Sequence, residues 1–123
     1  MFKPGDVVQF YSLGAQKQKY HLCLSLRGKF LYINSPKPRT FRGDFVVSCD
    51  EIPCLETTTS GKSVISCSMV LTLSDAELTH HGARKLGSVS RALLIDLIKF
   101  VEASPVLSAE DRDAILDELG DSI

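Results

Sequence analysis

Apolar and polar residues alternate along several short segments in the first 73 positions of the chain. Alternation with a period of two is typical of β-strands that bury one face. Segments rich in Gly and Pro separate these stretches, which favours a meander of antiparallel strands joined by turns. The predicted strands cover residues 6–11, 18–26, 29–34, 44–49 and 63–73.

The second and last of these strands show the alternation most clearly. In the second, the expected core face consists of Tyr20, Leu22, Leu24 and Leu26, opposite a polar face of Lys19, His21, Cys23 and Ser25. In the last, the expected core face consists of Ile65, Cys67, Met69, Leu71 and Leu73. We therefore expect each strand to be buried on one face and exposed on the other.

Helical patterns replace the strand pattern after residue 73. Ser74 and Glu77 have the spacing of a capping box and predict a short helix that ends near His80. Ser88 or Ser90 begins a longer helix, which Pro105 ends. Its apolar stripe is spaced by one, three, one and three positions, as one helix face requires, and consists of Leu93, Leu94, Leu97, Ile98 and Val101.

A last helix is predicted from Ser108, its N-cap, to a stop at Gly120. Its apolar face consists of Ile115, Leu116 and Leu119. Five strands followed by helices predict a mainly β protein, a small five-stranded barrel that leaves no open sheet edge. We expect one domain over residues 1–123, with the barrel at about 3–73 and the helical part at about 74–120.

Composition and charge limit the expected location and binding partners of the protein. The chain lacks a run of about 18 apolar residues and a signal-peptide pattern, so we expect no membrane span and a cytoplasmic location. Residues 1–42 contain eight basic residues and one acidic residue, and the rest of the chain contains six basic and fourteen acidic residues. This asymmetry indicates either an N-terminal part that meets polyanions or two oppositely charged parts that pack together. The four cysteines favour buried small side chains over a zinc site.

The order of motifs resembles the PemK/MazF family of bacterial toxins over residues 3–103. "PGDVV" is similar to the opening strand of the family, and "SVI…VLTL" with "KLGSVS" is similar to its closing strand and C-terminal helix. The resemblance implies an SH3-like barrel that forms a homodimer. It also implies a metal-independent endoribonuclease that cuts single-stranded RNA and is neutralised by an antitoxin, or a gyrase-directed relative of the CcdB type.

The family places an arginine at the start of the second strand and a serine or threonine at the end of the next. Here Tyr20-His21 stands at the arginine position, and Ser35 matches the second position, or Asn34 after a one-residue shift. RNA cleavage without metal needs an acid, a base and a cation near the phosphate. We therefore predict His21, Lys19 and Ser35 as catalytic residues, with no metal or cofactor. A solvated strand end and a turn at Ser35-Pro36 are the alternatives.

The segment "SPKPRTFRG" predicts a basic loop in which Lys37, Arg39 and Arg42 hold RNA phosphates and Phe41 stacks on a base. A charged surface loop is the simpler interpretation. "TTTSGKS" at 57–63 lacks the first glycine of a phosphate-binding loop, so nucleotide binding is not predicted. Because the family arginine is missing, two alternatives remain open: a catalytically inactive or altered barrel that acts as a protein- or nucleic-acid-binding module, and a DNA- or RNA-binding regulator.

Overall fold

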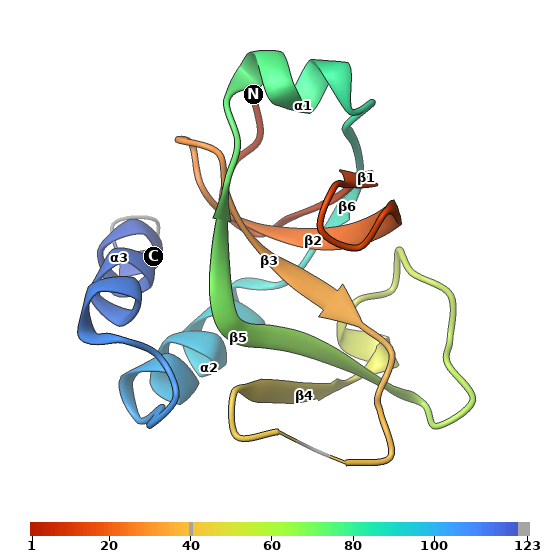
Figure 1. The fold of residues 1–123 in the computed structure, drawn as a ribbon. Helices are drawn as coiled ribbons and strands as arrows, with labels where there is room; N and C mark the ends of the chain where they lie inside the picture. The colour runs from red at the N-terminus through yellow and green to blue at the C-terminus, as the bar shows by residue number, and fades with distance from the viewer. Residues whose placement is uncertain (40, 121–123) are drawn as a thin grey trace.

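The computed structural model describes residues 1–39 and 41–120. Its centre is one antiparallel sheet of six strands in the order β4-β5-β3-β2-β1-β6 (Figure 1). The strands are β1 (Asp6–Ser12), β2 (Lys17–Ser25), β3 (Lys29–Asn34), β4 (Asp44–Ser48), β5 (Lys62–Thr72) and β6 (Arg84–Ser88). The helices are the 3₁₀ turn η1 (Cys49–Glu51), α1 (Asp75–His80), α2 (Arg91–Glu102) and α3 (Ala109–Gly120).

The protein is mainly β with two C-terminal helices, as predicted, but the sheet is not the closed five-stranded barrel expected from the sequence. It is open, with β4 and β6 as its edges. The sixth strand, β6, was missed because its five residues, "RKLGS", contain little apolar alternation. It forms by adding to the outer edge of β1, where Asp6 pairs with Ser88 and Gln9 pairs with Arg84.

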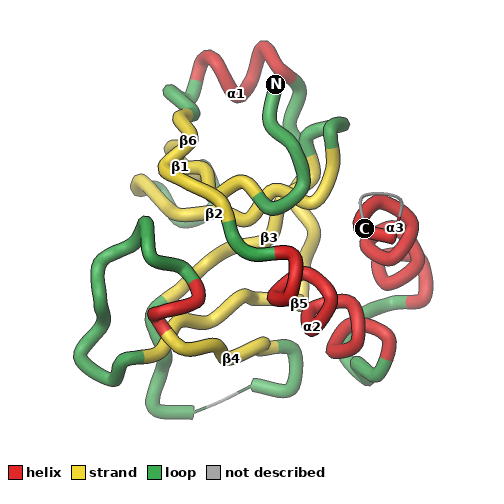
Figure 2. Tube along the Cα trace, turned by 180° about the vertical axis from the view of Figure 1, so that it is seen from behind, coloured by secondary structure: helices red, strands yellow, loops and turns green. Residues whose placement is uncertain are grey.

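Apolar clusters cover both faces of the sheet, and helices lie against it at opposite ends (Figures 1 and 2). The larger cluster packs α2 and α3 on one face and includes Leu22, Leu24 and Leu31. The smaller cluster on the other face contains Phe10, Phe30 and Cys23, with Leu78 of α1 among its buried members. The two faces of β2 are therefore both buried over His21–Ser25.

This double burial corrects the predicted faces of β2. Leu22 and Leu24 are buried as expected, but His21, Cys23 and Ser25 on the supposed polar face are buried too. Leu26 is 70% exposed, because β2 ends at Ser25 and the chain turns there. Alternation identifies the strand but cannot show that a second layer covers its other face.

β5 does not keep one face toward one core. Between Phe30 and Tyr32 of β3 the pairing register with β5 shifts, from Phe30 opposite Leu71 to Tyr32 opposite Ser66. Figure 1 shows β5 bending sharply within its length. Ile65 and Cys67 consequently pack in the larger cluster and Leu71 in the smaller one, while Met69 is exposed. A bulge of this kind interrupts the period of two.

The helix boundaries agree closely with the sequence. The Ser74 side chain accepts a hydrogen bond from the Glu77 amide, and the Glu77 carboxylate accepts from the Ser74 amide, forming the expected capping box. Ser90, not Ser88, caps α2 by accepting from the Leu93 amide at 3.1 Å. Ser108 accepts from the Asp111 amide at the start of α3. No helix within residues 1–39 and 41–120 is long and apolar enough to cross a membrane.

Candidate functional site

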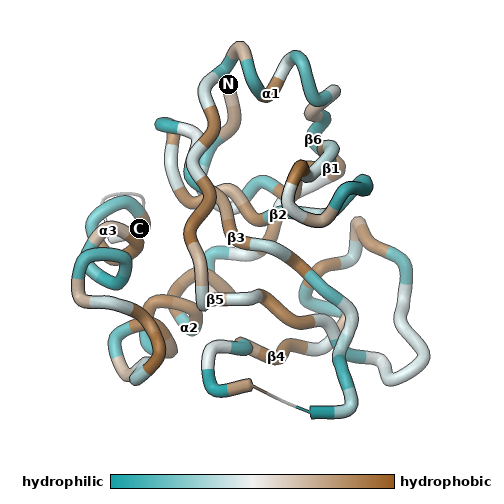
Figure 3. The backbone as a smooth tube through the Cα atoms, in the orientation of Figure 1, coloured by the Kyte–Doolittle hydropathy of each residue, from teal (hydrophilic) through white to brown (hydrophobic). Residues whose placement is uncertain are grey.

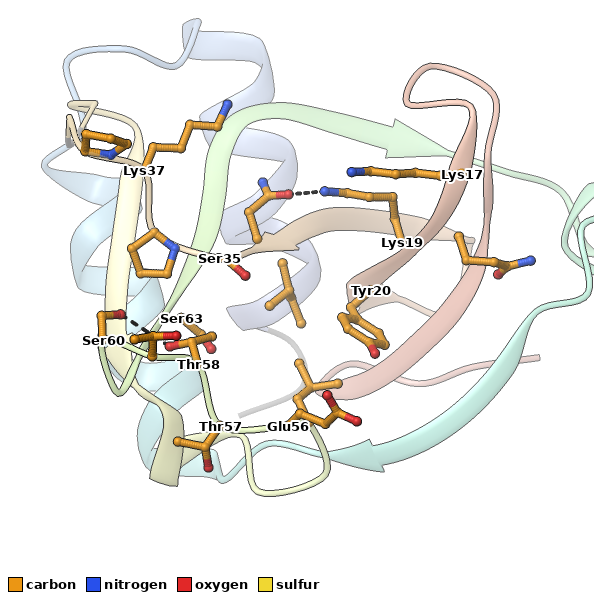
Figure 4. A pocket seen from close by; sticks show the side chains of 17 residues that line it. Lys17, Lys19, Tyr20, Ser35, Lys37, Glu56, Thr57, Thr58, Ser60 and Ser63 are labelled. Atoms are coloured by element: carbon orange, nitrogen blue, oxygen red, sulfur yellow. Dashed lines mark hydrogen bonds between the residues drawn. The ribbon is translucent and has the colours of Figure 1, made fainter.

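A pocket of about 800 Å³ lies at the polar end of the β2–β3 pair, facing the segment 55–60 (Figure 4). β2 contributes its first residues, which precede the buried part of that strand. The chain after β3 contributes Ser35 and Lys37, and the segment between η1 and β5 contributes a row of hydroxyl groups. In Figure 3 the start of β2 and the segment after β3 are hydrophilic, in contrast to the apolar centre of the sheet.

Three lysines, Lys17, Lys19 and Lys37, line this pocket, and Glu56 is the one acidic side chain among its described lining residues. Partial burial lowers the pKa of Lys19, and the positive charges of Lys17 and Lys37 lower it further. Lys19 is therefore partly desolvated and repelled by two neighbouring cations. An anion bound among them would relieve that repulsion.

Lys19 is held in a defined position. Its ammonium group donates a hydrogen bond to the side-chain oxygen of Asn34 on the neighbouring strand (Figure 4). It also lies 5.6 Å from the centre of the Tyr32 ring, within the range of a cation–π contact. The Tyr32 hydroxyl is fixed in turn by Ser12, at 2.7 Å. The charge is thus placed before any ligand arrives, which reduces the entropy lost on binding.

Local hydrogen bonds order the hydroxyl-rich wall. The Thr58 hydroxyl donates to the Lys62 carbonyl at 2.6 Å and lies 3.3 Å from the Ser60 hydroxyl. On its other side, Thr58 approaches the Cys49 thiol with both its amide (3.5 Å) and its hydroxyl (3.4 Å). The Thr58 hydroxyl and amide lower the pKa of Cys49 because both can donate to the thiolate, the hydroxyl by turning its one proton away from the Lys62 carbonyl.

A second pocket of about 400 Å³ adjoins the first, and Asn34, Ser35 and Lys37 line both. This second pocket is also lined by Arg42 and by Phe41, which is 58% exposed. The remaining lining side chains are mainly polar or small and include Asp44, Ser66, Ser68 and Val106. This second pocket offers an aromatic surface beside a cation, whereas the lysine pocket offers cations and hydroxyls.

The structure brings most of the predicted site residues together. Lys19, Ser35 and Lys37 share the lysine pocket, and Phe41 and Arg42 join Ser35 and Lys37 at the second one. Arg39 is exposed and lines neither.

His21 is not part of this group, contrary to the predicted convergence with Lys19 and Ser35. Its side chain is fully buried and stacks on Phe10, with ring centroids 3.6 Å apart. Its Nδ1 lies 3.3 Å from the Val8 carbonyl, and burial lowers its pKa to about 4. A neutral imidazole inside the smaller cluster cannot contact a substrate in the lysine pocket. The cause is the apolar layer over this face of the sheet, which the alternation pattern did not reveal.

Sequence reasoning missed two parts of the site. Lys17 lies two positions before Lys19, so the strand period alone would have placed both side chains on one face. The hydroxyls of residues 57–60 were considered only as a nucleotide-binding loop. Their place opposite the lysines depends on pairing between β3 and β5, which no local motif encodes.

Within the described residues, no group of three or more His, Cys, Asp or Glu side chains is arranged to bind a metal ion. All four cysteines are free thiols, and three of them are buried. Comparisons with protein-family models, with curated proteins and with solved structures gave no match to this chain. The case for a function therefore depends on the pockets themselves.

Proposed function

We propose that the lysine pocket binds phosphate groups of single-stranded RNA in the cytoplasm. The observation that carries this proposal is the convergence of Lys17, Lys19 and Lys37 on one pocket with a single opposing carboxylate, Glu56. Lysine ammonium groups bind phosphate as point charges, and hydroxyls supply further donors. This is the binding-module alternative, and it does not require the missing family arginine.

The test is fluorescence anisotropy with a labelled oligouridylate at several salt concentrations. Lys19→Gln and Lys37→Gln should each weaken binding about 5- to 10-fold at moderate salt. Each should also reduce the salt slope by about 0.7, the value for one lost phosphate contact on a single strand. Lys99→Gln on α2 removes the same charge away from the pocket and should leave the affinity nearly unchanged. Equal effects of all three variants, or no binding at low salt, would refute the proposal.

A second candidate is a toxin-like endoribonuclease of the PemK/MazF type. It is favoured by the place of Lys19, whose pKa is lowered, in the same pocket as Ser35. A lysine with a lowered pKa loses its proton more readily than an ordinary lysine, as a general base must. In this candidate the curled sheet is a six-stranded variant of the SH3-like barrel, the chain forms a homodimer, and an antitoxin covers the lysine pocket.

Incubation with labelled RNA in EDTA separates the two candidates. Cleavage that Lys19→Gln abolishes and His21→Phe retains would support the enzyme, whereas binding without cleavage supports the binding module. Light scattering on the purified chain tests the dimer, which would have twice the 13.5 kDa mass of one chain.

A further inference from the structure

We propose, building on phosphate binding in the lysine pocket, that one RNA strand continues into the second pocket, where the neighbouring base stacks on Phe41. The two pockets together would then recognise a phosphate and an adjacent base. A nucleoside monophosphate carries both groups, whereas inorganic phosphate would fill the lysine pocket alone.

The two pockets share a wall. Asn34, Ser35 and Lys37 line both pockets, so the two bound groups would be separated by the width of one short chain segment. Neighbouring units of one polymer meet that requirement. Pro36 and Pro38 lie in the same segment and fix its backbone φ angles, which limits the ordering needed when a strand crosses it.

Phe41 is exposed, and its backbone is held in place. An aromatic ring that is 58% exposed presents a face on which a base can stack. Its backbone is held at both polar atoms by Asp44: the Phe41 amide donates to the Asp44 carboxylate at 3.2 Å, and the Phe41 carbonyl accepts from the Asp44 amide at 3.0 Å. The backbone that carries the ring is therefore anchored to β4 although Phe41 belongs to a loop.

The size and the polar side chains of the second pocket suit a base. Its volume of about 400 Å³ lies at the small end of the range of ligand pockets. Gly43 keeps it open, since a Cβ there would come within 3.4 Å of Ser68 and 3.5 Å of Val106. The hydroxyls of Ser66 and Ser68, 3.2 Å apart, offer hydrogen bonds to the edge of a base.

The experiment compares short and long ligands on the whole protein. Competition against labelled hexauridylate would be measured with hexauridylate, uridine monophosphate and inorganic phosphate. Phe41→Ala should weaken hexauridylate and uridine monophosphate about 10-fold and leave inorganic phosphate within twofold, whereas Phe41→Trp should retain hexauridylate affinity. Lys19→Gln should weaken all three. Leu26→Ala, which removes another exposed apolar side chain away from both pockets, is the matched control.

The outcomes separate the two proposals. If Lys19→Gln weakens every ligand but Phe41→Ala behaves like Leu26→Ala, the strand path is wrong and phosphate binding stands. If the wild-type protein binds none of the ligands, phosphate binding fails and the strand path fails with it. Replacing hexauridylate with hexathymidylate tests whether the bound polymer is RNA or DNA. If the protein binds the DNA and not the RNA, the assignment to RNA is wrong. Thermal melting confirms that each variant is folded.

Discussion

The imidazole of His21 lies parallel to the phenyl ring of Phe10, with centroids 3.6 Å apart and planes 4° from parallel. Phe30 and Tyr32 approach the same imidazole, with centroids 6.2 Å and 5.2 Å away. The His21 Nε2 atom is buried and has no hydrogen-bond partner among the described residues. A proton added there would place a charge among aromatic rings, so the fold favours the neutral form.

This arrangement predicts a loss of stability in mild acid. The pKa of His21 is about 4 in the folded chain and 6.5 in an unfolded reference, so the unfolded state binds the proton first. The stabilising contribution is therefore complete above pH 6.5 and decreases as the pH falls toward about 4. Across that range the free energy of unfolding should fall by about 3 kcal/mol on account of this residue. Urea unfolding at a series of pH values measures it.

His21→Phe is the variant that isolates this effect, because carboxylates titrate in both proteins. The phenyl ring keeps the stack on Phe10 and removes the titrating nitrogen, so the difference in stability between variant and wild type should grow as the pH falls from 6.5 to 4. If the phenyl ring of His21→Phe packs poorly, His21→Leu also removes the titrating nitrogen and can replace it. A constant difference across the range would show that His21 does not titrate between the two states.

Gly28 should tolerate no side chain. Its φ is +77°, and a Cβ there would lie 2.0 Å from the Leu73 carbonyl oxygen. Gly28→Ala should lower the free energy of unfolding by about 3 kcal/mol or more, since backbone strain and overlap with backbone both act. Gly61→Ala is the matched control, because Gly61 has a φ of +73° and open space around it. It should cost about 1 kcal/mol, from strain alone.

The N-cap of α2 provides a prediction about the helix that packs on the larger cluster. Ser90→Ala removes the hydrogen bond to the Leu93 amide and should cost about 1 kcal/mol of stability. Ser88→Ala changes the other serine that the sequence offered as a cap, and it should cost no more than about 0.5 kcal/mol. Chemical denaturation of both variants measures the difference, and equal losses would contradict the assigned cap.

Thiol chemistry should distinguish Cys49 from the other cysteines. Hydrogen bonds from Thr58 lower the pKa of Cys49, whereas burial raises the pKa of Cys23 to about 11 and that of Cys67 to about 12. Iodoacetamide labelling of the native protein, resolved by peptide mass spectrometry, should therefore modify Cys49 ahead of Cys23 and Cys67. Thr58→Val should move the pH midpoint of Cys49 labelling upward. An unchanged midpoint would show that the Thr58 hydroxyl does not stabilise the thiolate, since the variant keeps the amide.

Local sequence signals predicted the elements well. The capping box at Ser74, the apolar stripe of α2 and the alternation of β2 are each complete within a few residues, so chain-local physics determines them. The errors lie where distant segments meet. β6 forms because the edge of β1 is available, and β5 bends where its pairing with β3 shifts register (Figure 1).

In the candidate site, too, local sequence predicted some residues correctly, and contacts between distant segments caused the error. Lys19, Ser35 and Lys37 were predicted from a short stretch of chain and do line one pocket. His21 was misplaced because its strand neighbours are polar, while the residues that bury it, Phe10 and Phe30, come from the adjacent strands. Whether the pocket binds RNA stays a prediction.

The pairing of β1 with β6 affects how the chain folds during its synthesis. Gln9 and Arg84 contact each other although they lie 75 positions apart. During translation β1 can form its hairpin with β2 early, but its other edge has no partner until β6 leaves the ribosome. Non-local pairing of this kind slows folding, and an unpaired strand edge invites association with other chains. Nascent chains that stop before residue 84 should therefore be the ones that chaperones bind and that aggregate.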